Sequence, residues 1–131
     1  MISVLLSTES HFPVDRNKLR SSVIEFLARR IRHAAEVSIS IVGDRLMKKL
    51  NTTYRKINET TDVLSFPLND PGVSGAFVEP PDKVLRLGDI VVSYPQAVAE
   101  AASDNMLVDD KIVELVFHGL DHLLGIHHDE G

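Results

Sequence analysis

The segment from residue 109 to residue 124 constrains the fold most, because its apolar residues lie on most sides of a helix and not along one stripe. A helix that is apolar nearly all round must be covered by other elements, so we expect it to lie at the centre of the domain. Asp109 and Asp110 are predicted to cap its start, and Gly125 is placed to end it in a left-handed conformation. The apolar positions are Ile112, Val113, Val116, Phe117, Leu120, Leu123 and Leu124.

The rest of the chain alternates between strand and helix patterns. Strands are predicted at residues 2–6, 37–41, 63–67 and 87–92. Further helices are predicted after an Asp15 cap, from Gly43–Asp44 with Leu46, Met47, Leu50 and Tyr54 on one face, and from Ser93 to about Ser103. A Pro- and Gly-rich loop from Asn69 to about Val84 is expected to be a mobile flap or an insertion. The order predicts an α+β domain, in which helices pack on a small mixed four-stranded sheet.

Composition excludes several classes of protein. The length of 131 residues fits one domain, which we expect to cover residues 1–131. The chain has no cysteine, which excludes disulfides, thiolate metal sites and a cysteine nucleophile, and favours a reducing cytoplasm. No apolar run approaches the ~18–20 residues of a membrane span, so we expect no membrane association.

Charge is spread unevenly along the chain. Residues 1–60 hold eleven Lys and Arg against six Asp and Glu, whereas residues 61–131 hold three against thirteen, and the net charge is −5. A basic half can meet phosphates, and an acidic half that contains histidines can attract a cation. Helices that merely differ in charge would give the same asymmetry, so the charge distribution alone does not identify a function.

Four of the six histidines fall in the last fourteen residues. On a helix, His118 and His122 lie about 40° apart and one turn along, a separation that one metal ion can bridge. Gly125 lets the chain reverse so that His128 supplies a third nitrogen, and the spacing H-x-x-x-H-x-x-G-x-x-H is the zinc-binding layout of the metzincins. Three histidines with an open position are typical of catalytic zinc, and the alternative is an exposed histidine patch.

The residue beside the first histidine separates this pattern from the peptidases. Metalloproteases of this layout carry a glutamate there as the general base, and this chain has Gly119. A peptidase mechanism therefore lacks its base, whereas metal binding is unaffected.

Four ordered motifs resemble those of the YbeY family of bacterial and organellar endoribonucleases. The histidine segment resembles the family signature H-G-x-L-H-L-x-G-Y-D-H, and Asn51–Arg55 resembles its L-N-x-x-Y-R. Residues 61–67 read T-D-V-L-S-F-P, as in the family, and residues 87–90 read L-G-D-I. The resemblance therefore runs through nearly the whole chain.

The resemblance implies a metal-dependent endoribonuclease that cuts single-stranded RNA during ribosomal RNA maturation, notably at the 3′ end of the small-subunit RNA, and in ribosome quality control. It implies the ribosome or ribosomal proteins as partners. The residues that match the three motif histidines, His118, His122 and His128, would hold one zinc ion or another divalent transition metal. The essential arginine of the family falls on Arg55.

The chain departs from the family pattern at three positions. Asp121 stands where the motif has leucine, Ile126 where it has tyrosine and His127 where it has aspartate. The interval after the glycine favours His128 over His127 as the third ligand. Family members usually continue into a further helix, so with a last residue at Gly131 we expect that helix to be absent.

Three functions stay open at this point. The metal-dependent ribonuclease is favoured over a ribosome-assembly factor with a structural metal that binds without cutting, and over a zincin-type peptidase. In the ribonuclease, a planar guanidinium at Arg55 suits two phosphate oxygens at once. Three further residues are weaker candidates. Ser65 is a candidate for substrate contact, Asp62 for capping a turn, and Asp89 for orienting a ligand or loop. A phosphate track is predicted from Arg16, Lys18, Arg20, Arg29, Arg30, Arg32, Lys48 and Lys49.

Overall fold

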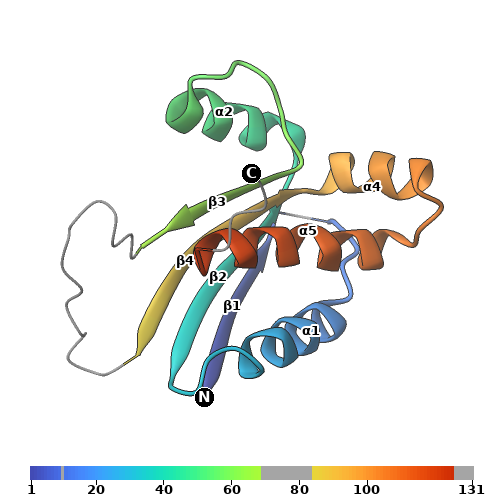
Figure 1. The fold of residues 1–131 in the computed structure, drawn as a ribbon. Coiled ribbons are helices and arrows are strands. Elements are labelled where there is room, and N and C mark those ends of the chain that lie inside the picture. The colour runs from blue at the N-terminus through green and yellow to red at the C-terminus, as the bar shows by residue number, and fades with distance from the viewer. Residues whose placement is uncertain (10, 69–83, 126–131) are drawn as a thin grey trace.

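The computed structural model describes residues 1–9, 11–68 and 84–125. Its elements are β1 (Ile2–Thr8), α1 (Arg16–Ala28), β2 (Ala35–Val42), α2 (Asp44–Arg55), β3 (Val63–Pro67), β4 (Leu85–Ser93), α4 (Tyr94–Ser103) and α5 (Val108–Leu123). The predicted α+β domain with a mixed four-stranded sheet is confirmed (Figure 1). Apart from Val84, the predicted loop lies outside the described residues.

The sheet has the strand order β1-β2-β4-β3. β1 pairs in parallel with β2, and β2 pairs in parallel with β4. β3 pairs antiparallel with β4, with Phe66 opposite Asp89 and Pro67 opposite Gly88. β3 is therefore an edge strand. Its predicted end at Pro67 is confirmed, and it ends there because proline cannot donate a ladder hydrogen bond.

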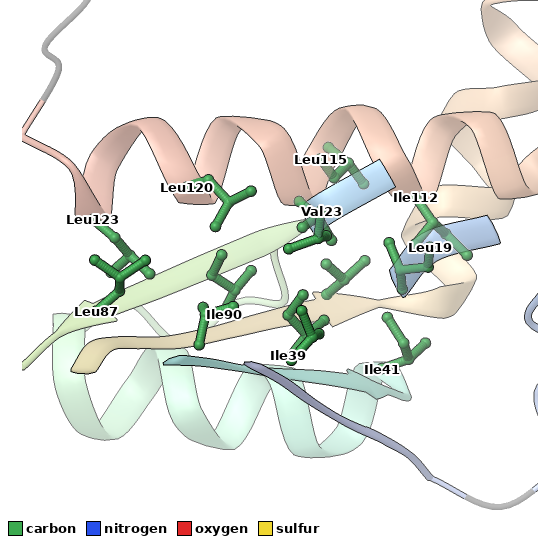
Figure 2. Packing of buried hydrophobic residues seen from close by; sticks show 14 of the residues in the cluster. Leu19, Val23, Ile39, Ile41, Leu87, Ile90, Ile112, Leu115, Leu120 and Leu123 are labelled. Atoms are coloured by element: carbon green, nitrogen blue, oxygen red, sulfur yellow. The ribbon is translucent and has the colours of Figure 1, made fainter. Parts of the chain in front are cut away.

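The main core lies between the sheet and α1 with α5. Alternate residues of β2, among them Ile39 and Ile41, are fully buried against these helices. Val116 and Leu120 of α5 are also fully buried, which confirms the central position predicted for this helix. Figure 2 shows α5 along one face of the sheet, with Ile112, Leu120 and Leu123 directed at the strands.

A smaller core lies on the opposite face, under α2. Met47 packs there with Leu46, Leu50 and residues of β3 and β4. The predicted apolar face of α2 is confirmed for these three residues and is wrong for Tyr54, which is 64% exposed. Tyr54 lies at the last turn of the helix, where its ring meets that of Phe66 from the edge strand β3 in a T-shaped contact, with 5.2 Å between ring centroids.

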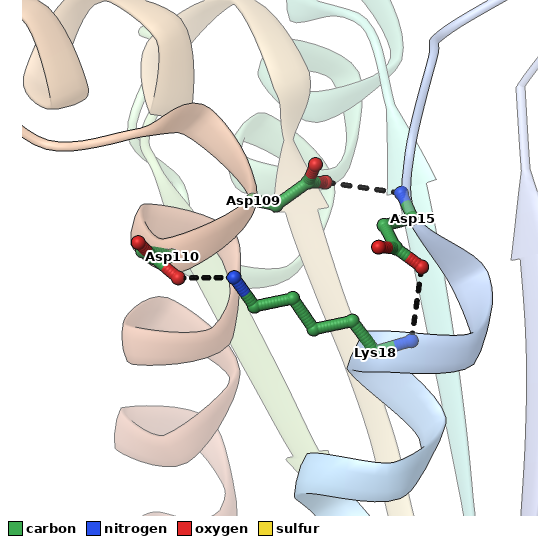
Figure 3. Close-up of polar contacts among 4 residues, drawn as sticks. All are labelled: Asp15, Lys18, Asp109 and Asp110. Carbon is green, nitrogen blue, oxygen red and sulfur yellow. Dashed lines mark hydrogen bonds and ion pairs between the residues drawn. The ribbon is translucent and has the colours of Figure 1, made fainter.

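The start of α5 differs from the prediction. The helix begins at Val108 and Leu107 is the N-cap residue, without a side-chain hydrogen bond, so Asp109 and Asp110 lie in the first turn. Both carboxylates interact favourably with the positive end of the helix dipole, and both also bind residues at the start of α1. Asp109 accepts a hydrogen bond from the Asp15 backbone N–H at 3.0 Å, and Asp110 pairs with Lys18 (Figure 3).

The other predicted helix ends are confirmed. Asp15 caps α1 by accepting from the Lys18 backbone N–H at 3.0 Å. Ser93 caps α4, in which Pro95 occupies the first turn. Gly125 follows Leu124, the C-cap residue of α5, and has a φ of +82°, the left-handed conformation expected of it. Within the described ranges, no helix is long and apolar enough to cross a membrane.

Candidate active-site cleft

His118 and His122 lie one turn apart on the exposed side of α5, as the sequence predicts. Both imidazoles line one cleft of about 310 Å³. The cleft also contains the end of α2 and the middle of β3, so it joins segments that are far apart in the sequence. Its lining residues are Arg55, Val63, Leu64, Ser65, His118, Gly119 and His122.

Arg55 is the last residue of α2, and the chain geometry that follows holds it there. Lys56 adopts a left-handed conformation with a φ of 62°, which stops the helix. The buried side chain of Asn51 then anchors the following loop by donating a hydrogen bond to the Glu59 carbonyl at 2.8 Å. Arg55 is exposed and forms no ion pair with any residue that the structure describes, so its guanidinium is available to a ligand of the cleft.

The start of α2 is fixed by Asp44, where the helix is predicted to begin but whose long-range side-chain contacts were not predicted. Its carboxylate accepts hydrogen bonds from the Ser93 hydroxyl at 2.7 Å, the Thr60 hydroxyl at 2.9 Å and the Gln96 amide at 3.2 Å. Burial raises the pKa of Asp44, but the hydrogen bonds from Ser93, Thr60 and Gln96 outweigh it and leave the pKa below its usual value. Asp44 therefore ties the helix that carries Arg55 to the segment before β3 and to the last residue of β4, which lie at the same end of this antiparallel pair.

The close packing of α5 against the sheet beside the cleft requires a glycine at Gly119. A Cβ atom at this position would lie 2.9 Å from Cγ2 of Ile90, a fully buried residue of β4. The glycine lets α5 approach the sheet closely and leaves no room for the glutamate that metalloproteases carry at this position.

Ser65 and Asp62 lie on or next to β3. Ser65 lines the cleft, and its hydroxyl makes no hydrogen bond to any described residue. Asp62 accepts from the Val63 backbone N–H at 2.7 Å, which agrees with the predicted turn cap. Asp89 lies outside this cleft and lines a hollow on the other face of the sheet.

Glu100 of α4 is a second residue that sequence reasoning missed. Burial raises its pKa to about 7, helped by the hydrogen bond to the Asp62 carboxyl and by the negative charge of that group. The carboxyl of Glu100 therefore keeps its proton up to the neutral range, next to the segment that leads into β3. No local pattern marks this pair, because its members lie far apart in the sequence.

The histidines suit a metal ion in residue type and spacing, but the described part of the site is incomplete. Two imidazoles one turn apart are a usual pair of zinc ligands. His128, the predicted third ligand, lies outside the described residues, and within the described ranges no three His, Cys, Asp or Glu side chains form a group that could hold a metal ion. The metal site therefore stays a prediction.

This fold and cleft define a small α+β domain in which an arginine and paired histidines face one hollow. Residues 6–131 match the family model described as "Endoribonuclease YbeY". The chain belongs to this family, as the resemblance in its motifs predicted.

Individual relatives agree with the family model. The "Endoribonuclease YbeY" of Roseiflexus castenholzii is 43% identical over 96 residues, which cover 73% of this chain and 58% of that protein. The protein of the same name from Dehalococcoides mccartyi (strain BAV1) is 37% identical over 102 residues, covering 74% of this chain and 64% of the relative. The chain thus spans about three-fifths of the length of these relatives.

One solved structure has the same fold. The solution structure of TM1509 from Thermotoga maritima superposes with a TM-score of 0.63 at 24% identity. The match covers 98% of this chain and 76% of the other.

Proposed function

We propose that this protein is a metal-dependent endoribonuclease that hydrolyses single-stranded RNA. The observation that carries the proposal is the cleft that brings Arg55 to His118 and His122. The family relatives named as endoribonucleases support the same reaction. We further propose the maturation of ribosomal RNA, notably the 3′ end of the small-subunit RNA, and ribosome quality control as its cytoplasmic task, with the ribosome or its proteins as partners.

The proposed metal ligands are His118, His122 and His128, with α5 acting as a zincin-like metal-binding helix. All three are imidazoles, which zinc and similar transition metals accept. A bound ion supplies Lewis-acid activation at the phosphodiester. The protein's part is to present two imidazoles from adjacent turns of a helix whose opposite side is locked in the core.

Arg55 is the proposed catalytic residue. A guanidinium pairs with two phosphate oxygens at once and stabilises the charge that builds on them during hydrolysis. Its place at the C-terminal end of α2, with no described carboxylate partner, leaves this charge to the substrate. Ser65, from β3, provides a hydroxyl within the same cleft for a further hydrogen bond to RNA.

The predicted phosphate track divides between α2 and a stretch that covers α1 and the residues just after it. Lys18 of α1 pairs with Asp110, and Arg29, the C-cap residue of α1, pairs with Glu25 at 3.0 Å. On α2, the helix of Arg55, Lys48 and Lys49 are exposed and form no ion pair with described residues. We therefore propose that α2 makes the main phosphate contacts.

The proposal is tested by incubating the purified protein with a 5′-labelled single-stranded RNA, the same RNA in a duplex, and casein. We expect cleavage of the single strand alone, and its loss after treatment with a chelator. Binding of RNA without cleavage would favour the non-cleaving assembly factor, and hydrolysis of casein would favour a peptidase. Either result contradicts the proposed activity.

A further inference from the structure

A second hollow lies on the α2 face of the sheet, across the edge strand from the cleft. It measures about 350 Å³, within the range of small-ligand sites. Residues that are adjacent in the sequence line different hollows. Arg55 lines the cleft and Tyr54 lines the second hollow. In the same way, Ser65 lines the cleft and Phe66 lines the second hollow. The lining residues of the second hollow are Ser40, Leu50, Tyr54, Phe66, Asp89 and Val91.

The aromatic ring of Tyr54 is unusually open. The other described ring pairs, Phe12 with Tyr94 and Phe26 with Phe117, involve half-buried side chains packed on the main core. Tyr54 is 64% exposed and meets Phe66 edge to face, with 63° between the ring planes. An exposed ring of this kind, next to an arginine, suits stacking by an unpaired base.

The polar group of the hollow is Asp89. It lies opposite Phe66 in the β3–β4 register, is exposed, and forms no ion pair with any described residue. A carboxylate repels phosphate but accepts hydrogen bonds from amino groups. The chemistry of the hollow therefore fits a base and not the sugar-phosphate backbone.

We infer that this hollow is a nucleobase subsite, in which an unpaired base next to the scissile phosphate stacks on Tyr54 and donates its exocyclic amino group to Asp89. The inference rests on the proposed function and adds a specificity to it. Adenine, cytosine and guanine carry such amino groups and uracil does not, so the subsite favours the first three bases over uracil.

Binding is measured first by tyrosine fluorescence, since the chain has no tryptophan and two tyrosines. Tyr94→Phe keeps the stacked contact with Phe12 and leaves Tyr54 as the sole reporter. With a chelator present to prevent cleavage, we expect a saturable change in Tyr54 emission with a short adenine-containing RNA, and a weaker response with an all-uracil RNA.

Affinity is then measured by the anisotropy of a labelled RNA. Tyr54→Leu is expected to weaken binding about five- to hundredfold, the usual effect of losing one stacked base, whereas Tyr54→Phe keeps the affinity. An abasic nucleotide at the stacked position should weaken binding to the native protein and have little further effect on Tyr54→Leu. Asp89→Asn, which can donate as well as accept, is expected to remove the discrimination against uracil.

The outcomes separate this inference from the proposed function. Equal RNA affinity of Tyr54→Leu and the native protein, with circular dichroism unchanged, would overturn the subsite while RNA cleavage still supports the nuclease. Equal affinity for the adenine and uracil RNAs would overturn the role of Asp89. Failure of the native protein to bind or cut any RNA would overturn both proposals.

Discussion

At the scale of single residues, two carboxylates with opposite pKa shifts lie around β3. Hydrogen bonds to Asp44 hold its pKa low, so its stabilising contribution is present at neutral pH and is lost as pH falls below its usual value of 3.8. Glu100, beside Asp62, has its pKa raised to about 7. Its contribution is complete below its usual value of 4.5 and is lost as pH rises through 7.

Glu100→Gln tests this pair. The amide is neutral at every pH and can still donate to Asp62, so the variant removes the repulsion that builds up as Glu100 ionises. We expect it to be more stable than the native protein at pH 8 by about 1–3 kcal/mol, and nearly equal at pH 5. Urea denaturation at the two pH values measures this.

Glu25→Gln is the matched control, since Glu25 is an exposed side chain on α1 that pairs with Arg29. It should leave the difference between the two pH values as it is in the native protein. A Glu100→Gln variant with the native pH profile would show that the pKa of Glu100 is not raised.

At the scale of elements, the cleft depends on how closely α5 approaches β4. The contact between Gly119 and Ile90 sets this approach, and it fixes where both histidines stand relative to β3. Gly88 does the same for the β3–β4 pair, because its φ is +140° and a Cβ would lie 2.2 Å from the Phe66 carbonyl oxygen. Two motif glycines are thus explained by close contacts.

Gly119→Ala tests the helix position. Helix propensity favours alanine by about 1 kcal/mol, but the methyl group would enter a closed contact with Ile90, and overpacking usually costs about 1–3 kcal/mol. We expect a net loss of stability in denaturant unfolding, and partial recovery when Ile90→Ala is added to the variant, compared with Ile90→Ala alone. A Gly119→Ala protein more stable than the native one would contradict the packing role.

The elements themselves were predictable, since each has a clear period of apolar residues, and α1 and α4 also have the side-chain caps Asp15 and Ser93. The start of α5 was misplaced because Asp109 and Asp110 serve a contact with α1, which no local pattern contains. The helix period alone puts Tyr54 on the apolar face of α2. Its exposure depends on the order of the strands in the sheet, which the helix period does not contain.

At the scale of the whole molecule, motif spacing and the family resemblance predicted candidate site residues, and the fold brings three of them to one cleft. Arg55 and the pair His118 and His122 come from separate elements, and only the antiparallel addition of β3 at the sheet edge brings them to one cleft. The Asp44 and Glu100 contacts could not be predicted, because each joins segments distant in sequence. The predicted ligand His128 lies outside the described residues.

The central claim is that Arg55 acts on the phosphate held beside a metal on the histidines. Arg55→Ala tests this claim most directly. Metal content and the single-turnover cleavage of labelled RNA are measured on the same sample of this variant. The account predicts close to one equivalent of metal, as in the native protein, with cleavage reduced about 100-fold or more. It predicts that His118→Ala and His122→Ala lose both metal and cleavage, and that Arg45→Ala, an exposed arginine of α2 outside the cleft, loses neither. Native cleavage rates in Arg55→Ala, or full metal content in His118→Ala, would contradict it.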